Sequence, residues 1–158
     1  MSQPTRRKIE NKVKPKQTIK SKRKHQEYGT SKLEDRFAKE FLDKMGVKYT
    51  RQYKAEDIGR YYDFYVITGE RSGILIEIDG NYFHGRGLVH EEKNRMQKHS
   101  EYVDNLKNNW AIKNKIPLVR IWEHDINNNP SVVYRELKEV IDKYTTKEKL
   151  KENKNKRH

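Results

Sequence analysis

The two most apolar stretches of this chain carry carboxylates, and this combination constrains the possible fold more than any other feature. Only 32% of the 158 residues are hydrophobic, yet residues 61–67 and 74–79 consist mostly of aromatic and β-branched side chains. Such runs, separated by the turn-forming segment 68–73, predict two neighbouring β-strands. The second run is nearly all apolar, so we expect it to lie in the centre of a sheet.

The acids in these strands predict a cation site. Side chains alternate along a strand, so Glu77 and Asp79 share one face, and a short hairpin would bring Asp63 alongside them. Carboxylates in a strand built for burial are costly unless something compensates them. Three of them together favour Mg²⁺, with Mn²⁺ able to substitute. Each acid also has an ordinary interpretation: Asp79 and Gly80 suit a tight turn, and Asp63 could pair with an arginine.

Four further residues are candidates for catalysis or phosphate contact. His84 could take a proton from a water attacking phosphorus, or it could be a structural histidine beside aromatic residues. Asp104 could orient that imidazole or be a solvated helix charge, and Lys107, one turn later, could steady a phosphate or be exposed. Glu34 completes a capping box with Ser31, and it also lies beside an apolar helix stripe that should contact the sheet.

The remaining periodicities complete an α/β pattern. Residues 85–99 are polar and predict no particular element. The predicted elements are a helix over about 31–45, strands at 47–53, 61–67 and 74–79, a helix from about 101, a strand at 117–122 and a helix over about 130–144. The order α-β-β-β-α-β-α predicts a mixed sheet flanked by helices.

The net charge of +13 lies in the two ends of the chain. Residues 1–29 hold ten basic and two acidic residues, residues 143–158 hold seven and two, and residues 30–142 hold nineteen of each. We therefore divide the chain into a basic disordered arm (1–29), a folded domain (30–144) and a lysine-rich, nearly structureless tail (145–158). The arm is either a solubilising segment or a phosphate-binding one, in which case the candidate contacts are Arg6, Arg7, Lys22, Arg23 and Lys24.

Composition excludes several classes of protein. No apolar run is long enough to span a bilayer, and no apolar segment follows the basic N-terminus as in a secretory signal. The absence of cysteine excludes disulfides and thiolate zinc ligands. We therefore expect an intracellular protein without a membrane partner. The pI of about 9.7 indicates a polyanionic partner, with nucleic acid favoured over a membrane surface.

The candidate residues also occur in a familiar order. Residues 31–124 resemble the very-short-patch-repair (Vsr) endonucleases and the Vsr-like homing endonucleases of phages, within the PD-(D/E)xK nuclease superfamily. The Gly-x-aromatic-aromatic-His signature of that family is matched by Gly80-Asn81-Tyr82-Phe83-His84, and the closing strand by residues 118–123. The homing group is described by the succession Glu, Asp, variable residue, His, Asp, which here reads Glu34, Asp63, Asp79, His84 and Asp104.

This resemblance implies a restriction-endonuclease-like fold and a Mg²⁺-dependent endonuclease that hydrolyses phosphodiester bonds of double-stranded DNA. His84 would be the general base, oriented by Asp104. Asp63, with Asp79 or Glu77, would bind the metal, and Glu34 would complete the acidic site. A phage-encoded enzyme would act in the cytoplasm of a bacterial host, and cutting both strands would suit a homo-oligomer.

The sequence departs from the family pattern at two points, which bear on the type of endonuclease that we expect. Asp79 stands where many members of the superfamily carry lysine, and the repair enzymes bind a structural zinc through cysteines that this chain lacks. We therefore expect no structural zinc and favour a homing-type enzyme over a mismatch-repair-type nicking endonuclease. A non-catalytic nucleic-acid-binding protein on the same fold is the alternative from another functional class.

Overall fold

A computed structural model describes residues 31–157 of the chain. The predicted arm, with Arg6, Arg7, Lys22, Arg23 and Lys24, lies outside the described residues. The elements are α1 (Lys32–Phe37), the π-helical turn η1 (Ala38–Leu42), α2 (Asp43–Met45), β1 (Tyr49–Ala55), η2 (Glu56–Ile58), β2 (Arg60–Gly69), β3 (Ser72–Asp79), η3 (His90–Glu92), α3 (Arg95–Lys113), β4 (Leu118–Trp122), α4 (Glu123–Asn128) and α5 (Pro130–Lys156).

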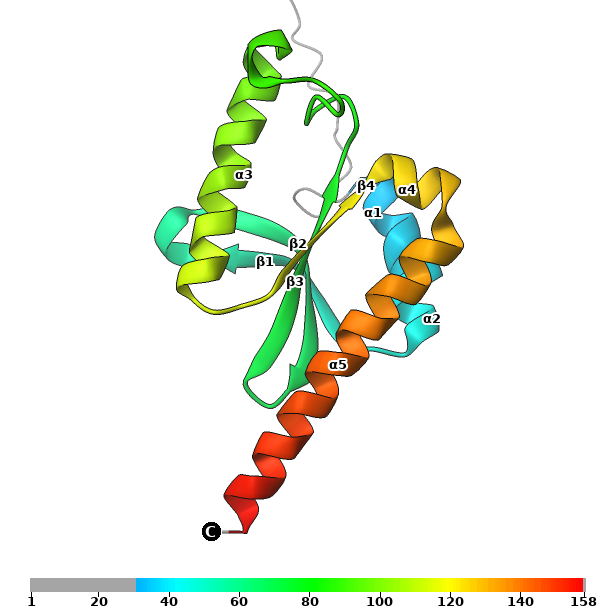
Figure 1. The fold of residues 1–158 in the computed structure, drawn as a ribbon, viewed down its shortest axis with the longest axis vertical. Helices are drawn as coiled ribbons and strands as arrows, with labels where there is room; N and C mark the ends of the chain where they lie inside the picture. Colours follow the sequence, from blue (N-terminus) through cyan, green and yellow to red (C-terminus); the bar gives the residue numbers. More distant parts are fainter. Residues whose placement is uncertain (1–30, 158) are drawn as a thin grey trace, which may run out of the picture.

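A four-stranded mixed sheet, in the order β1-β2-β3-β4, forms the centre of the fold (Figure 1). The first three strands are antiparallel neighbours, and β4 returns parallel to β3 after the crossover through α3. The apolar run that predicted a central strand is β3, which is buried along most of its length. The α/β class and the mixed sheet flanked by helices are thus confirmed.

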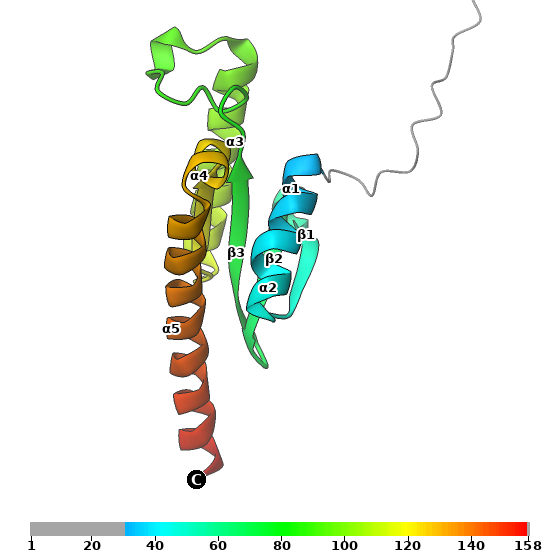
Figure 2. The ribbon, with the colours of Figure 1, turned by 90° about the vertical axis from the view of Figure 1, so that its right-hand side faces the viewer.

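The helices form two layers on opposite faces of the sheet. On one face, α1 and α5 lie side by side, and Phe37, Ile76 and Leu137 belong to the main core there (Figures 1 and 2). On the other face α3 covers the sheet, and a smaller core contains Tyr62 and Leu75 (Figure 1). The two carboxylates of β3 lie on this second face, between the sheet and α3. No helix of residues 31–157 is long and apolar enough to span a membrane.

Helix α3 begins at Arg95, well before the predicted start near Glu101. Its first turn is polar, so apolar periodicity could not reveal it. The start is instead specified by a capping box, because Asn94 Oδ1 accepts from the amide of Gln97 at 2.9 Å and Gln97 Oε1 accepts from the amide of Asn94 at 3.0 Å. The short helix α4, between β4 and α5, was also absent from the predicted order.

Helix α5 corrects the prediction that the chain becomes nearly structureless after Tyr144, because the helix continues to Lys156. Its last turns contact the β2–β3 hairpin, where Glu152 Oε1 accepts from the amide of Glu70 at 3.3 Å. Lysine and glutamate also have high helix propensity. The lysine-rich segment is therefore largely an extension of the folded domain.

Candidate active site

The candidate site lies where β3 ends, at a point where β2 and β3 separate. The backbone pairing of these strands stops at Phe64 and Ile76. Beyond it the amide of Asp63 donates to Glu77 Oε1 at 3.1 Å, and the amide of Ile78 donates to Asp63 Oδ2 at 2.7 Å. Two carboxylates thus replace the backbone ladder and are held between the strands.

Glu34, Asp63 and Glu77 form what we call the carboxylate cluster. The charges of Glu77 and Glu34 act on Asp63, and together with its burial, the largest cause, they raise the pKa of Asp63 to about 8. Burial also raises the pKa of Glu34, which a backbone hydrogen bond from Ser31 opposes. Glu34 therefore acts at the helix cap and still contributes charge to the cluster.

One cationic side chain and one amide side chain contact the carboxylate cluster. Lys107 Nζ lies 2.9 Å from Glu77 Oε2, and its side chain is only 12% exposed. Gln52 Nε2 donates to Glu34 Oε2 at 3.2 Å. Lys107 is thus a largely buried lysine, not an exposed one, and its ammonium group pairs with a buried carboxylate.

Gln52 was not predicted as a site residue, and its position depends on unusual backbone geometry. Its φ is +52°, in the left-handed region that residues other than glycine rarely adopt. The β1–β2 pairing passes from Arg51 opposite Phe64 to Tyr53 opposite Tyr62, so Gln52 has no paired residue. The irregular backbone directs this amide toward Glu34. A glutamine in a predicted strand carries no sequence signal for that conformation.

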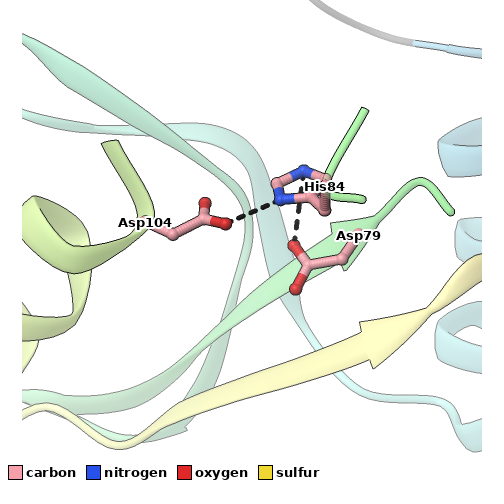
Figure 3. A group of neighbouring side chains, drawn as sticks. All are labelled: Asp79, His84 and Asp104. Carbon is pink, nitrogen blue, oxygen red and sulfur yellow. Dashed lines mark hydrogen bonds and ion pairs between the residues drawn. The ribbon is translucent and has the colours of Figure 1, made fainter. Parts of the chain in front are cut away.

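Asp79, His84 and Asp104 form a second group, the histidine cluster (Figure 3). His84 Nδ1 lies 2.6 Å from Asp104 Oδ2, and His84 Nε2 lies 3.8 Å from Asp79 Oδ1. Within residues 31–157 this is the one set of three His, Asp or Glu side chains whose ligand atoms all lie within 4.8 Å of one another. The predicted contact between His84 and Asp104 is thus present.

The loop after β3 holds His84 between α3 and α4. Asn81 contributes two contacts to the start of α4: its amide donates to Glu123 Oε1 at 3.3 Å, and its side-chain oxygen accepts from the amide of His124 at 3.2 Å. On the other side Gln97 Nε2 donates to the carbonyl of Tyr82 at 2.7 Å. The loop that carries His84 is therefore held on both sides by contacts with residues distant in the sequence.

Arg120, on β4, connects the two acids of the histidine cluster. Its Nη1 lies 3.0 Å from Asp79 Oδ1 and 3.3 Å from Asp104 Oδ1. Its Nε donates to Asn108 Oδ1 at 2.9 Å, which fixes the orientation of the guanidinium group. Sequence reasoning missed both Arg120 and Asn108, because nothing in a short apolar strand marks its arginine as a partner of distant acids.

The electrostatics of the histidine cluster favour a charged imidazole. The hydrogen bond to Asp104 is the main cause that raises the pKa of His84 above its usual 6.5, and burial opposes it. Burial raises the pKa of Asp79, while Arg120 and His84 lower it. When the ring is neutral, a hydrogen bond from Nδ1–H to Asp104 selects the tautomer in which Nε2 can accept a proton.

The predicted metal ligands therefore divide between the two clusters. Asp63 is adjacent to Glu77, while the close neighbours of Asp79 are His84, Asp104 and Arg120 rather than Asp63. Asp63 Oδ1 accepts no hydrogen bond from residues 31–157, and burial, followed by the charges of Glu77 and Glu34, raises the pKa of this carboxyl. The carboxylate cluster offers oxygen ligands of the kind that a hard cation prefers, but within residues 31–157 its ligand atoms do not all lie within 4.8 Å of one another. The histidine cluster meets that distance, and its acids already pair with Arg120.

No protein-family model, curated protein or solved structure matches this chain.

Proposed function

We propose that this protein is a Mg²⁺-dependent DNA endonuclease that hydrolyses phosphodiester bonds. The observation that carries the proposal is the 2.6 Å contact between His84 and Asp104 at the same end of β3 as the half-buried Asp63 and the buried Glu77. A histidine oriented by a carboxylate, next to acids that suit a cation, is an arrangement that can activate water beside a phosphate. The ordered resemblance to Vsr-like nucleases supports the same reaction.

Asp63 and Glu77, with Glu34 nearby, would hold the magnesium ion, and Mn²⁺ should replace it. When bound, the metal supplies positive charge to the phosphate and the leaving oxygen. We assign the second ligand to Glu77 rather than Asp79, because Asp63 and Glu77 bind across the same strand pair. Lys107 then balances the remaining charge of Glu77.

His84 would act as the general base. Its Nδ1–H donates to Asp104, and Nε2 accepts the proton of the attacking water. Arg120 contacts the other oxygen of Asp104 and so holds this carboxylate in the orientation that faces the ring. Asp104 and Arg120 are positioning residues in this scheme, since their effect on the water is transmitted through His84.

The finer form of the proposal is a phage-type homing endonuclease acting on double-stranded DNA. The order of Glu34, Asp63, Asp79, His84 and Asp104 supports it, as does the lack of cysteine for the zinc site of the repair enzymes. If both strands are cut, two copies of the chain would have to act on one target.

A non-catalytic nucleic-acid-binding protein is the second candidate, and one observation favours it. Lys107 and Arg120 already pair with Glu77 and Asp79, at 2.9 and 3.0 Å. A network of this kind also occurs as a purely structural feature of a folded domain. In that case the cationic chain ends would bind phosphates and the acids would serve the fold alone.

Nicking of supercoiled plasmid DNA in Mg²⁺ distinguishes the two candidates. We expect Asp63→Asn and His84→Ala to lose at least about a hundredfold in rate, the usual range for a metal ligand or a general base. The matched controls are Asp142→Asn and His99→Ala, which change an exposed acid and an exposed histidine away from both clusters. Unchanged cutting by both site variants would refute the proposed site, and binding without metal-dependent cutting would favour the second candidate.

A further inference from the structure

A polar cavity lies at the opposite end of the sheet from the candidate active site. It has a volume of about 380 Å³ and is lined by the end of β2, the start of β3, the chain between α3 and β4, and the last turns of α5. Along β3 the distance from Gly73, at the cavity, to Asp79, at the active site, is about 20 Å at 3.3 Å per residue. The cavity is therefore separate from the catalytic machinery.

The cavity gathers cations from three segments that are distant in sequence. Arg71 comes from the β2–β3 turn, Lys115 from the chain after α3, and Lys147 and Lys151 from α5. Glu148 is the one acid among the lining residues, and it pairs with Lys151 at 3.2 Å. None of the other three cations forms an ion pair with residues 31–157. Three exposed cationic side chains thus line the cavity without an ion-pair partner among the described residues.

Two tyrosines provide neutral hydrogen-bond donors in the same cavity. The rings of Tyr53 and Tyr65 stack with their centroids 4.7 Å apart. A Cβ atom at Gly73 would lie 2.2 Å from the Tyr65 ring, so glycine at this position lets the phenol lie across β3. Within the described part of the chain neither phenol hydroxyl has a hydrogen-bond partner, and neither is a buried unpaired atom. Both hydroxyls are therefore available to a ligand.

This combination of groups selects a phosphate-bearing ligand. Phosphate oxygens accept hydrogen bonds and carry negative charge, which matches guanidinium, ammonium and phenol donors. The cavity is larger than one phosphate group, and its cations enter from different sides. Linked phosphates meet these conditions better than a single anion.

We propose that this cavity binds two or more linked phosphate groups, as found in a polyphosphate chain or along a nucleic-acid strand. The site goes beyond the proposed nuclease activity and does not depend on it. The groups that hold the ligand are Arg71, Lys115, Lys147, Tyr53 and Tyr65.

The test is a titration of the full-length, ¹⁵N-labelled protein with tripolyphosphate in the absence of divalent metal. We expect saturable shifts of the Gly73 and Lys115 amide signals. Arg71→Ala combined with Lys147→Ala should weaken binding at least about tenfold, because two charge-assisted contacts are lost. The matched control combines Lys39→Ala with Lys44→Ala, which removes the same charge from exposed lysines near α2 and should change affinity less than about twofold.

A second arm of the titration identifies the source of the phosphates. A short DNA duplex that shifts the same amides and competes with tripolyphosphate identifies a nucleic-acid strand as a ligand. A duplex that does neither, while tripolyphosphate binds, assigns the cavity to a free polyphosphate. Absence of saturable binding, or equal weakening by the cavity and control variants, would overturn the proposal. Since no cleavage is measured, these results are independent of the plasmid-nicking experiment.

Discussion

The carboxylate cluster and the histidine cluster lie at the same end of β3, but different groups pair with their acidic side chains. In the carboxylate cluster three acids share one lysine, and the pKa of Asp63 is raised to about 8. In the histidine cluster two acids are balanced by an arginine and an imidazole. The first cluster has fewer pairing partners than acids, while in the second cluster the two numbers are equal. In the function proposed above, this difference is the reason for placing metal binding in the first cluster and proton transfer in the second.

The largest expected effect is on the nicking rate, and it tests whether Asp63 or Asp79 is the metal ligand. Asp63→Asn should remove Mg²⁺ binding and lower the nicking rate by about a thousandfold or more, because it deletes the carboxylate with the least compensation. Asp79→Asn should lower the rate less and leave the Mg²⁺ dependence of nicking nearly unchanged. The measurement is the nicking rate against Mg²⁺ concentration for both variants. If Asp79→Asn shifts the Mg²⁺ midpoint as much as Asp63→Asn, the assignment to Glu77 is wrong.

The next effect concerns the pH dependence of the histidine cluster. A general base must be deprotonated, so the nicking rate should rise with pH and level off above the raised pKa of His84, which exceeds 6.5. Asp104→Asn removes the hydrogen bond that is the main cause of this increase. The variant should be slower by about 10–100-fold, with its pH midpoint moved downward.

Rates for this pH experiment should be measured at saturating Mg²⁺, which keeps Asp63 ionised across the range. Glu101→Gln is a suitable control, because it changes another helix acid of α3 that pairs with a different histidine, His90. An unchanged pH midpoint in Asp104→Asn would contradict the proposed role of this contact.

A smaller effect on the nicking rate is expected for Arg120, which contacts both Asp79 and Asp104. Arg120→Lys keeps the charge but loses the fork that contacts Asp79, Asp104 and Asn108 together. We expect a loss of about tenfold in nicking rate with little change in the Mg²⁺ midpoint. Arg86→Lys, a change of the same chemistry outside both clusters, provides the comparison. Equal rates for Arg120→Lys and the parent would show that Asp104 is held without the guanidinium group.

The smallest expected effect is on the free energy of unfolding, which should fall as the pH rises. The folded-state pKa of Asp63, about 8, lies above its ordinary value of 3.8, so the folded state binds this proton more tightly than the unfolded state. The free energy of unfolding should therefore fall as pH rises from about 4 to about 8. Without divalent metal, Asp63→Asn should be more stable than the parent at pH 8 by about 1–2 kcal/mol, and similar to it near pH 4.

Thermal unfolding at both pH values measures this difference, with Asp142→Asn as the exposed control. Added Mg²⁺ should raise the melting temperature of the parent at pH 8 and leave that of Asp63→Asn unchanged, because only the parent retains the full ligand set. A variant less stable than the parent at pH 8 would show that the charge of Asp63 is compensated by the fold itself.

Much of the fold was predictable because it depends on short-range patterns. Apolar runs identified β2, β3 and β4, and the stripe on α1, η1 and α2 identified the first helical segment. The start of α3 and the end of α5 were not identified. The first depends on a polar capping box and the second on contacts with the β2–β3 hairpin, and neither produces an apolar period.

The sequence by itself determined which chemical groups reach the end of β3. The alternation along this strand places Glu77 and Asp79 on one face. This relation follows from the geometry of a few consecutive residues, which does not depend on the rest of the fold. The position of His84 does depend on it, because Asn81 contacts α4 and Gln97 contacts Tyr82 in the loop that carries this histidine.

Only the tertiary structure decided how these groups are paired. Lys107 meets Glu77 across 30 positions, Arg120 meets Asp79 across 41, and Gln52 meets Glu34 through a left-handed residue. Periodicity specifies the face on which a side chain lies, but its partner is set by the packing of α3 and β4 against the sheet. For that reason the division of these side chains into a carboxylate cluster and a histidine cluster could be recognised only in the folded chain.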